Sequence, residues 1–131
     1  MCFIVMSKKQ ITTAAAPAAL GPYSQGIVAG GFFFASGQVP IDPATGELAG
    51  ETVEAQARQV FANLEQVLAA AGCGFADVLK TTVFLTDLAN FAEVNGIYAE
   101  YFVEPFPARS CVEVARLPKD VLLEIEAVAV K

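Results

Sequence analysis

Histidine is absent from this chain of 131 residues. Without it, the chain cannot form a Ser-His or Cys-His nucleophile pair or a metal site built on imidazole. Cysteine is scarce, because Cys2, Cys73 and Cys111 lie far apart and form no CxxC pair. Neither a zinc cage nor a disulfide framework is indicated, so we predict no metal and a reduced, cytoplasmic setting.

Basic residues are also few, with eight Lys and Arg against fourteen Asp and Glu and a net charge of −6. Affinity for nucleic acid and for anionic membrane comes largely from Lys and Arg, so the sequence predicts neither partner. No apolar run approaches the roughly 18 residues of a membrane span. The apolar start MCFIV is too short for a secretory signal. We expect residues 1–6 to be a leader outside the core; whether Met6 is the true start stays open.

Hydrophobic residues make up 55% of the chain and charged residues 17%. This composition predicts one folded domain spanning residues 1–131. The apolar fraction is high for a small monomer, which indicates surface buried against another subunit.

Side-chain periodicity predicts an α+β two-layer domain with a mixed sheet. The expected strands are residues 10–12, 27–28, 32–38 and 77–86, and the expected helices are 51–71 and 90–102, the second opened by a capping box at Asn90. Two helices can cover only one face of such a sheet. We therefore expect the other face to pack against another subunit in a homo-oligomer.

The stretch 106–126 is predicted to be a hairpin whose strands are joined at residues 117–120. Side chains alternate in a strand, so Arg109 shares a face with Cys111, and Glu124 shares one with Glu126. If Arg116 pairs with Val121, all four lie on one face of the sheet. An arginine, a thiol and two carboxylates together form a candidate site; the alternative is the solvated face of a half-buried hairpin.

Three further positions are candidates for binding. Tyr23 lies in the Gly- and Pro-rich loop 17–26, where a phenol either packs or binds a ligand. At Ser36-Gly37 a glycine would let a ligand approach the backbone closely. Asn95 lies beside the apolar stripe of the second helix and needs a hydrogen-bond partner in the chain or in a ligand.

Several motifs in this order resemble the Rid (YjgF-type) family, most closely the RidA branch of enamine/imine deaminases. They are GPYSQG at 21–26, SGQ at 36–38, DPxTG at 42–46, VNxxY at 94–98, PARSCxxxAxLP at 107–118 and EIEA at 124–127. The resemblance covers the chain from about Met6 to Lys131.

The resemblance implies a chorismate-mutase-like fold and a homotrimer with active sites between subunits. It implies hydrolysis of 2-aminoacrylate and related enamine or imine acids to 2-keto acids and ammonia, with neither metal nor organic cofactor. Pyridoxal-phosphate enzymes release such reactive acids, so the implied role is metabolite damage control.

By the same resemblance, Arg109 holds the substrate carboxylate and Glu124 positions or activates water. Cys111 lines the pocket and, with no histidine beside it, is not expected to be a nucleophile. The other matched pocket positions are Tyr23, Ser36, Gly37 and Asn95. Glu126 has no matched role.

Two alternatives to a deaminase stay open. The first is a non-catalytic regulatory trimer that binds 2-keto acids; the presence of both Arg109 and Glu124 favours the enzyme, because binding a carboxylate does not require a nearby anion. The second is a chorismate mutase, suggested only by fold analogy. Some members of the family have been linked to RNA cleavage or chaperone-like action, and the acidic charge makes RNA cleavage the less attractive of these.

Overall fold

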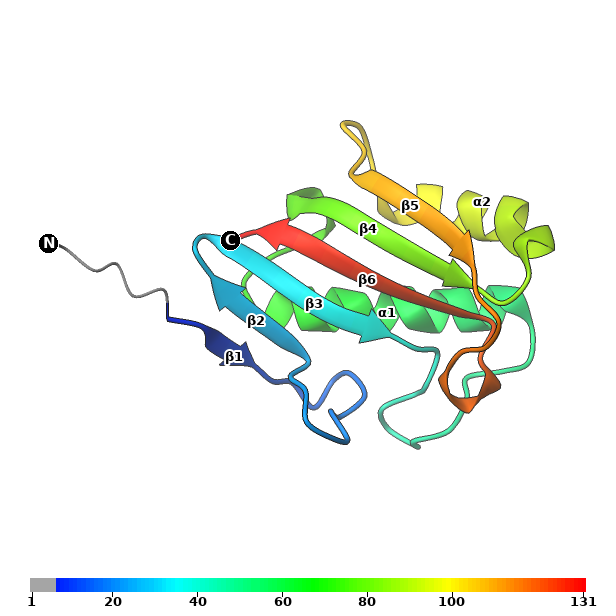
Figure 1. The fold of residues 1–131 in the computed structure, drawn as a ribbon, viewed down its shortest axis with the longest axis horizontal. Helices are drawn as coiled ribbons and strands as arrows, with labels where there is room; N and C mark the ends of the chain where they lie inside the picture. The colour runs from blue at the N-terminus through cyan, green and yellow to red at the C-terminus, as the bar shows by residue number, and fades with distance from the viewer. Residues whose placement is uncertain (1–6) are drawn as a thin grey trace, which may run out of the picture.

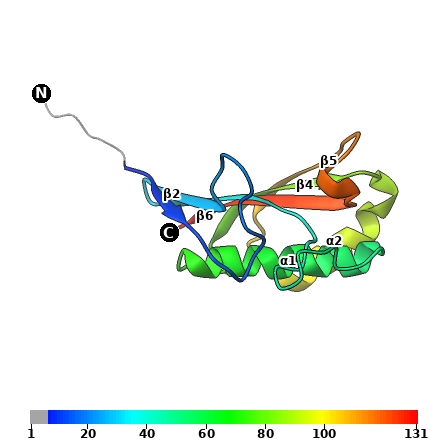
Figure 2. The ribbon, with the colours of Figure 1, turned by 90° about the horizontal axis from the view of Figure 1, so that it is seen from below.

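The computed structural model describes residues 7–131, and the expected leader 1–6 lies outside them. One six-stranded sheet carries both helices on a single face (Figures 1 and 2). The strands are β1 (Lys9–Ile11), β2 (Gly26–Ala29), β3 (Phe32–Gln38), β4 (Val78–Leu85), β5 (Ala108–Glu113) and β6 (Leu123–Val130), and the helices are α1 (Val53–Ala70) and α2 (Phe91–Tyr101). The predicted α+β class, with two helices on one face of a mixed sheet, is confirmed.

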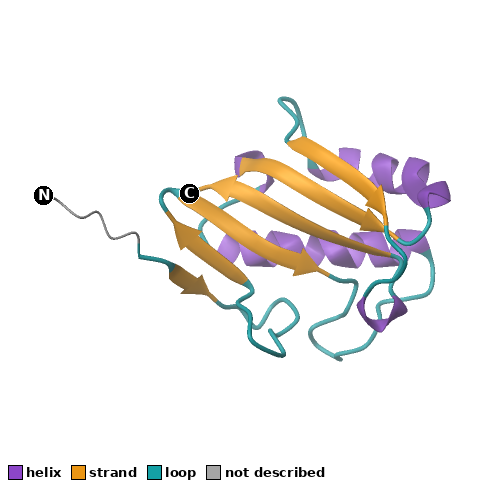
Figure 3. Ribbon diagram, viewed as in Figure 1, coloured by secondary structure: helices purple, strands orange, loops and turns teal. Residues whose placement is uncertain are grey.

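The sheet order is β1-β2-β3-β6-β4-β5. All pairs are antiparallel except β4 with β5, which run parallel and are joined through α2 (Figure 3). A parallel pair needs such a crossover, since a tight turn cannot return the chain to the same end of the sheet. The C-terminal strand β6 therefore lies inside the sheet, between β3 and β4.

The prediction that β5 and β6 form a hairpin is wrong. Strand β4 lies between them, and β6 pairs with β3 on its other side. Residues 114–122 cross the end of β4, with a short 3-10 turn at Pro118–Asp120. The pairing of Arg116 with Val121 does not occur. Arg116 instead forms an ion pair with Asp120, at 2.6 Å between Nε and Oδ1.

The start of α2 also differs from the prediction. A 3-10 turn, Leu88–Asn90, precedes the helix, and the Asp87 carboxylate accepts from Ala89 N at 2.9 Å. Asn90 makes no side-chain capping bond, so the chain uses Asp87 as the cap one turn earlier. The buried stripe of α2 includes Ile97, whereas Phe91 is partly exposed.

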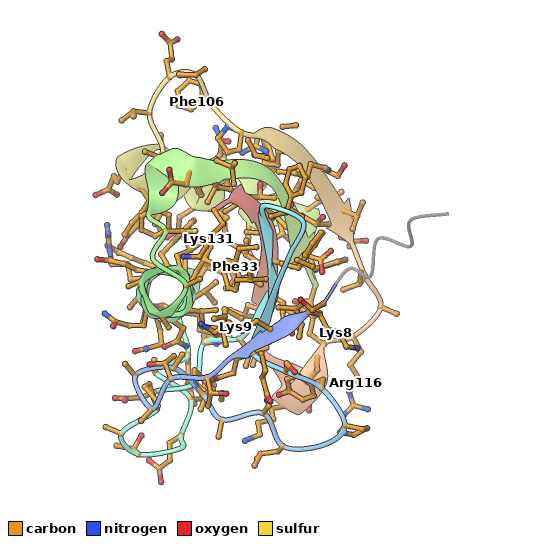
Figure 4. The ribbon with its side chains drawn as sticks, turned by 90° about the vertical axis from the view of Figure 1, so that its left-hand side faces the viewer. Lys8, Lys9, Phe33, Phe106, Arg116 and Lys131 are labelled. Carbon is orange, nitrogen blue, oxygen red and sulfur yellow. The ribbon has the colours of Figure 1, made fainter. Side chains whose placement is uncertain are left out.

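The core lies between the sheet and the helices. Phe61 of α1 is fully buried and contacts four aromatic rings, those of Phe75, Tyr98, Tyr101 and Phe102. Strand β3 contributes Phe33, which lies between the sheet and α1 in Figure 4. These close aromatic contacts hold both helices against one face of the sheet.

The opposite face of the sheet exposes several apolar side chains and is uncovered in the single chain. Alternation along β3 places Phe33 in the core and leaves Phe32 and Phe34 on the other face, 43% and 47% exposed. Burial of this face by another copy stays a prediction. No helix within residues 7–131 is long and apolar enough to cross a bilayer.

Gln56 connects α1 to two other segments. Its Oε1 accepts from Leu122 N at 2.8 Å and its Nε2 donates to Gly50 O at 3.0 Å. The side chain is buried, so it fixes the loop before α1 and the start of β6 at once.

We predict that Gln56→Leu lowers the free energy of unfolding by about 2–4 kcal/mol, because it leaves two part-buried backbone groups unpaired. Chemical denaturation measures the change. Gln66→Leu on the exposed face of the same helix is the control and should change stability by no more than about 0.5 kcal/mol. Equal effects of the two substitutions would contradict the assigned role of Gln56.

Candidate active site

Arg109 lies on β5 at the edge of the sheet, and its side chain contacts α2. Its Nη1 donates to Asn95 Oδ1 at 2.8 Å. The guanidinium carbon lies 4.8 Å from the ring centroid of Tyr98 and 5.4 Å from that of Phe91. Within residues 7–131 the bond to Asn95 is the one hydrogen bond of this guanidinium. Its other N–H groups are therefore available to an anion, and a guanidinium matches a carboxylate bidentately.

Cys111 lies on the same face of β5, two residues after Arg109, and is half-buried against the core. Burial raises the pKa of the Cys111 thiol, and the charge of Arg109 offsets only part of this effect. A thiol in its protonated form is a poor nucleophile. Its position is consistent with a wall of the site.

Glu124 lies on β6 and is half-buried. Gly37 of β3 stands directly against it, and a Cβ at position 37 would overlap the Glu124 carboxylate. Burial raises the pKa of the Glu124 carboxyl, and the charge of Glu126 raises it further. A raised pKa makes the carboxylate a stronger base, which suits a group that accepts and returns a proton.

A bulge of β3 at Ser36-Gly37 places Gly37 beside this carboxylate. Ala35 pairs with Ala127 and Gln38 with Ile125, so two residues of β3 oppose the single residue Glu126. The bulge breaks the regular register beside Glu124. It leaves the space that the carboxylate occupies.

Tyr23 and Ser36 line an open hollow of about 460 Å³ on the uncovered face of the sheet, together with Glu126. The Ser36 hydroxyl donates to Ser24 O, which ties the Tyr23 loop to β3. Tyr23 itself is 53% exposed. Its phenol is therefore available to a ligand.

Gln25 supports this loop and was missed by the sequence reasoning. Its buried amide donates to the carbonyls of Thr13 and Pro17, at 3.0 and 2.7 Å, and accepts from Thr13 N at 2.7 Å. The signal available in the sequence was a glutamine inside a Gly- and Pro-rich loop. Such a loop has many unpaired backbone groups that a side-chain amide can satisfy.

The structure does not bring all the predicted residues together in one chain. Arg109 is the parallel-register partner of Thr81, which faces the helices and is fully buried. Glu124 is the antiparallel partner of Phe84. Phe84 lies three residues after Thr81 on β4, so its side chain points to the opposite face of the sheet. The prediction that Arg109 and Glu124 share a face is therefore wrong.

The predicted site residues thus fall into two groups, which we call the anchor group and the carboxylate group. The anchor group, next to α2, contains Arg109, Asn95 and Cys111. The carboxylate group, on the uncovered side, contains Glu124 and Gly37, which are in contact, and Ser36 and Tyr23, whose hollow is lined by Glu126 and not by Glu124. Neither includes a cluster of three or more His, Cys, Asp or Glu side chains suited to a metal ion, within the part of the chain that the structure describes.

Comparison with known proteins gives consistent matches. The family described as endoribonuclease L-PSP matches residues 13–131. A RutC family protein of Synechocystis is 60% identical over 127 residues, which cover 95% of this chain and 98% of that protein. A Salmonella typhimurium protein named 2-iminobutanoate/2-iminopropanoate deaminase is 56% identical over 126 residues, covering 94% and 98%. A solved structure of a Rid family protein of unknown function from Yersinia pestis has a TM-score of 0.93 and 49% identity, covering 95% of this chain and all of that one.

The raised pKa of Glu124 makes a prediction about stability. A carboxyl whose pKa is higher in the folded state favours folding below its unfolded pKa, and this contribution is lost as pH rises through the folded pKa. At pH 7 the half-buried charge of Glu124 destabilises the folded state. Glu124→Gln removes this charge, so it should raise the free energy of unfolding at pH 7. The gain should shrink as pH falls through the raised folded pKa of Glu124, and it should be gone below the ordinary glutamate pKa.

Denaturation curves at several pH values measure this effect, with the exposed Glu65→Gln as the matched control. A loss of stability at pH 7 would contradict the prediction. It would indicate a cation opposite the carboxylate that compensates its charge.

Proposed function

Since the chain belongs to the endoribonuclease L-PSP family, also known as the Rid or YjgF-type family, we propose that it is a cofactor-independent enamine/imine deaminase. Its substrates are 2-aminoacrylate-type acids, and its products are 2-keto acids and ammonia. The observation that carries the proposal is a positioned guanidinium with unused donors together with a half-buried carboxylate of raised pKa. The similarity to named imine deaminases supports the same reaction.

Arg109 binds the carboxylate that all these substrates share. Asn95 and the two aromatic rings fix the guanidinium plane, so little conformational entropy is lost on binding. Fixing the carboxylate orients the adjacent C2 carbon, which is the electrophilic atom of the imine.

Glu124 positions the attacking water. Water adds to C2 while one of its protons passes to the Glu124 carboxylate, which returns it to the nitrogen as the C2=N bond becomes a single bond. In the resulting carbinolamine, Glu124 takes the hydroxyl proton and delivers it to the amino group, so the C–N bond breaks, ammonia leaves and the 2-keto acid forms. An enamine first takes a proton on its terminal carbon, which converts it to the imine. No oxidant, reductant or metal is needed, and a positioned acid/base contributes about 10²–10⁴-fold.

A complete site requires more than one copy of the chain, because the anchor group and the carboxylate group lie on opposite faces of the sheet. We propose that the anchor group of one copy meets the carboxylate group of another in a homotrimer. Such a contact joins two different patches, and a closed ring of these contacts gives cyclic symmetry. The exposed Phe32, Phe34 and Val130 supply apolar surface for it.

A non-catalytic 2-keto-acid-binding trimer is the alternative. Gly37 leaves space for the half-buried Glu124 carboxylate. Burying this charge is costly, and a protein that only binds an anion would not need it. RNA cleavage, named in the family description, is disfavoured by the net charge of −6.

We predict that Arg109→Ala lowers kcat/KM for imine hydrolysis about 10- to 150-fold while leaving the fold intact, because it removes a charge-assisted contact worth about 1.5–3 kcal/mol. The assay couples the protein to a pyridoxal-phosphate dehydratase or an amino-acid oxidase and follows keto-acid or ammonia release. Several amino-acid precursors should be compared, and the exposed Arg116→Ala serves as the control. Wild-type protein without effect on any precursor would contradict the deaminase proposal, and keto-acid binding without turnover would favour the alternative.

The proposed assembly makes a separate prediction. Arg109→Ala and Glu124→Gln proteins, each with strongly reduced activity alone, should regain activity after being mixed, unfolded and refolded together. With random assembly, about a quarter of the sites would combine two intact groups. Activity absent from the mixture, or sedimentation as a monomer at micromolar concentration, would contradict the shared site.

A further inference from the structure

Thr81 and Tyr98 form a buried pair of hydroxyl groups beneath the anchor group. Thr81 is 0% and Tyr98 5% exposed. The Thr81 Oγ1 lies 2.8 Å from the Tyr98 OH. The pair joins β4 to α2, the two elements that flank Arg109.

Both residues are placed to act on Arg109. Thr81 is its register partner on β4, so their side chains leave the sheet side by side. The Tyr98 ring offers its face to the guanidinium at 4.8 Å. This distance is well within the roughly 6 Å over which a cation and an aromatic face attract each other.

A simpler reading is that the two hydroxyls only satisfy each other inside the core. Phenylalanine at position 98 would fill the same space without burying a polar group, as Phe61 and Phe102 do nearby. The hydroxyl adds a fixed link between the ring and β4. Burial raises the pKa of Tyr98, so the ring stays neutral beside the cation.

We propose that Tyr98 is a positioning residue for Arg109 and that Thr81 fixes Tyr98 through the hydroxyl bond. The proposal rests on the proposed function, in which Arg109 holds the substrate carboxylate. Tyr98 sets the height and tilt of the guanidinium, Asn95 sets its rotation, and the chemistry at C2 belongs to the carboxylate group of another copy.

The experiment compares Tyr98→Leu, Tyr98→Phe and Thr81→Val in the full chain. Affinity for 2-oxobutanoate, measured by titration calorimetry, reports on the anchor without turnover, and KM and kcat are measured in the coupled assay. Tyr98→Leu should weaken binding and raise KM about 3- to 30-fold, the range of one cation–π contact. Its kcat should change less than about twofold, because the carboxylate is held equally in ground and transition states. Tyr98→Phe and Thr81→Val should lie between wild type and Tyr98→Leu.

Tyr101→Leu is the matched control. Tyr101 lies on the same helix and stacks on Phe61 at 4.4 Å in the same aromatic cluster, so its loss should reduce stability while leaving affinity and KM unchanged. Equal losses of affinity in the Tyr98 and Tyr101 variants would overturn the proposal, as would unchanged affinity in Tyr98→Leu. Should Tyr98→Leu fail to fold, wild-type affinity in both Tyr98→Phe and Thr81→Val would overturn it. The predicted order of affinities without turnover in wild type would refute the deaminase and support the positioning role.

Discussion

The alternation of side chains across a single sheet is the constraint on which the whole arrangement depends. Arg109 and Glu124 lie on strands separated by β4, and their partners on that strand, Thr81 and Phe84, point to opposite faces. No side-chain rotation can bring them together within one chain, because a sheet of paired strands separates them. Each face therefore carries one of the two groups of candidate site residues. In the proposed enzyme, catalysis then requires assembly of several copies.

The two groups are built by different means. The anchor group uses a helix: α2 presents Asn95, Phe91 and Tyr98 to a single arginine on the sheet edge. The carboxylate group uses an irregularity, since the bulge at Ser36-Gly37 makes space beside Glu124. The contacts of the first are already complete in one chain. The second holds a carboxyl in a setting that disfavours its charge, a cost typical of functional sites.

Local structure followed from the sequence, and long-range pairing did not. Periodicity predicted a helix over residues 51–71, close to the observed α1 (Val53–Ala70), because periodicity depends on neighbours in the chain. The hairpin of β5 and β6 was wrong, because strands adjacent in sequence pair only about two-thirds of the time. The site residues came from motif resemblance. Buried amides such as Gln25 and Gln56 escaped notice because their partners lie 6 to 66 residues away.

The separation of the two groups has a consequence for how the proposed activity would depend on assembly. A single chain keeps a positioned guanidinium, so an isolated copy would still hold a carboxylate, though without the orienting walls of a closed site. It would lack a carboxylate next to C2, because its own Glu124 faces the other way. Dissociation would then reduce turnover much more than it reduces substrate binding. The apparent kcat would therefore depend on subunit concentration, whereas KM would change little. An enzyme with both groups on one face would show no such difference.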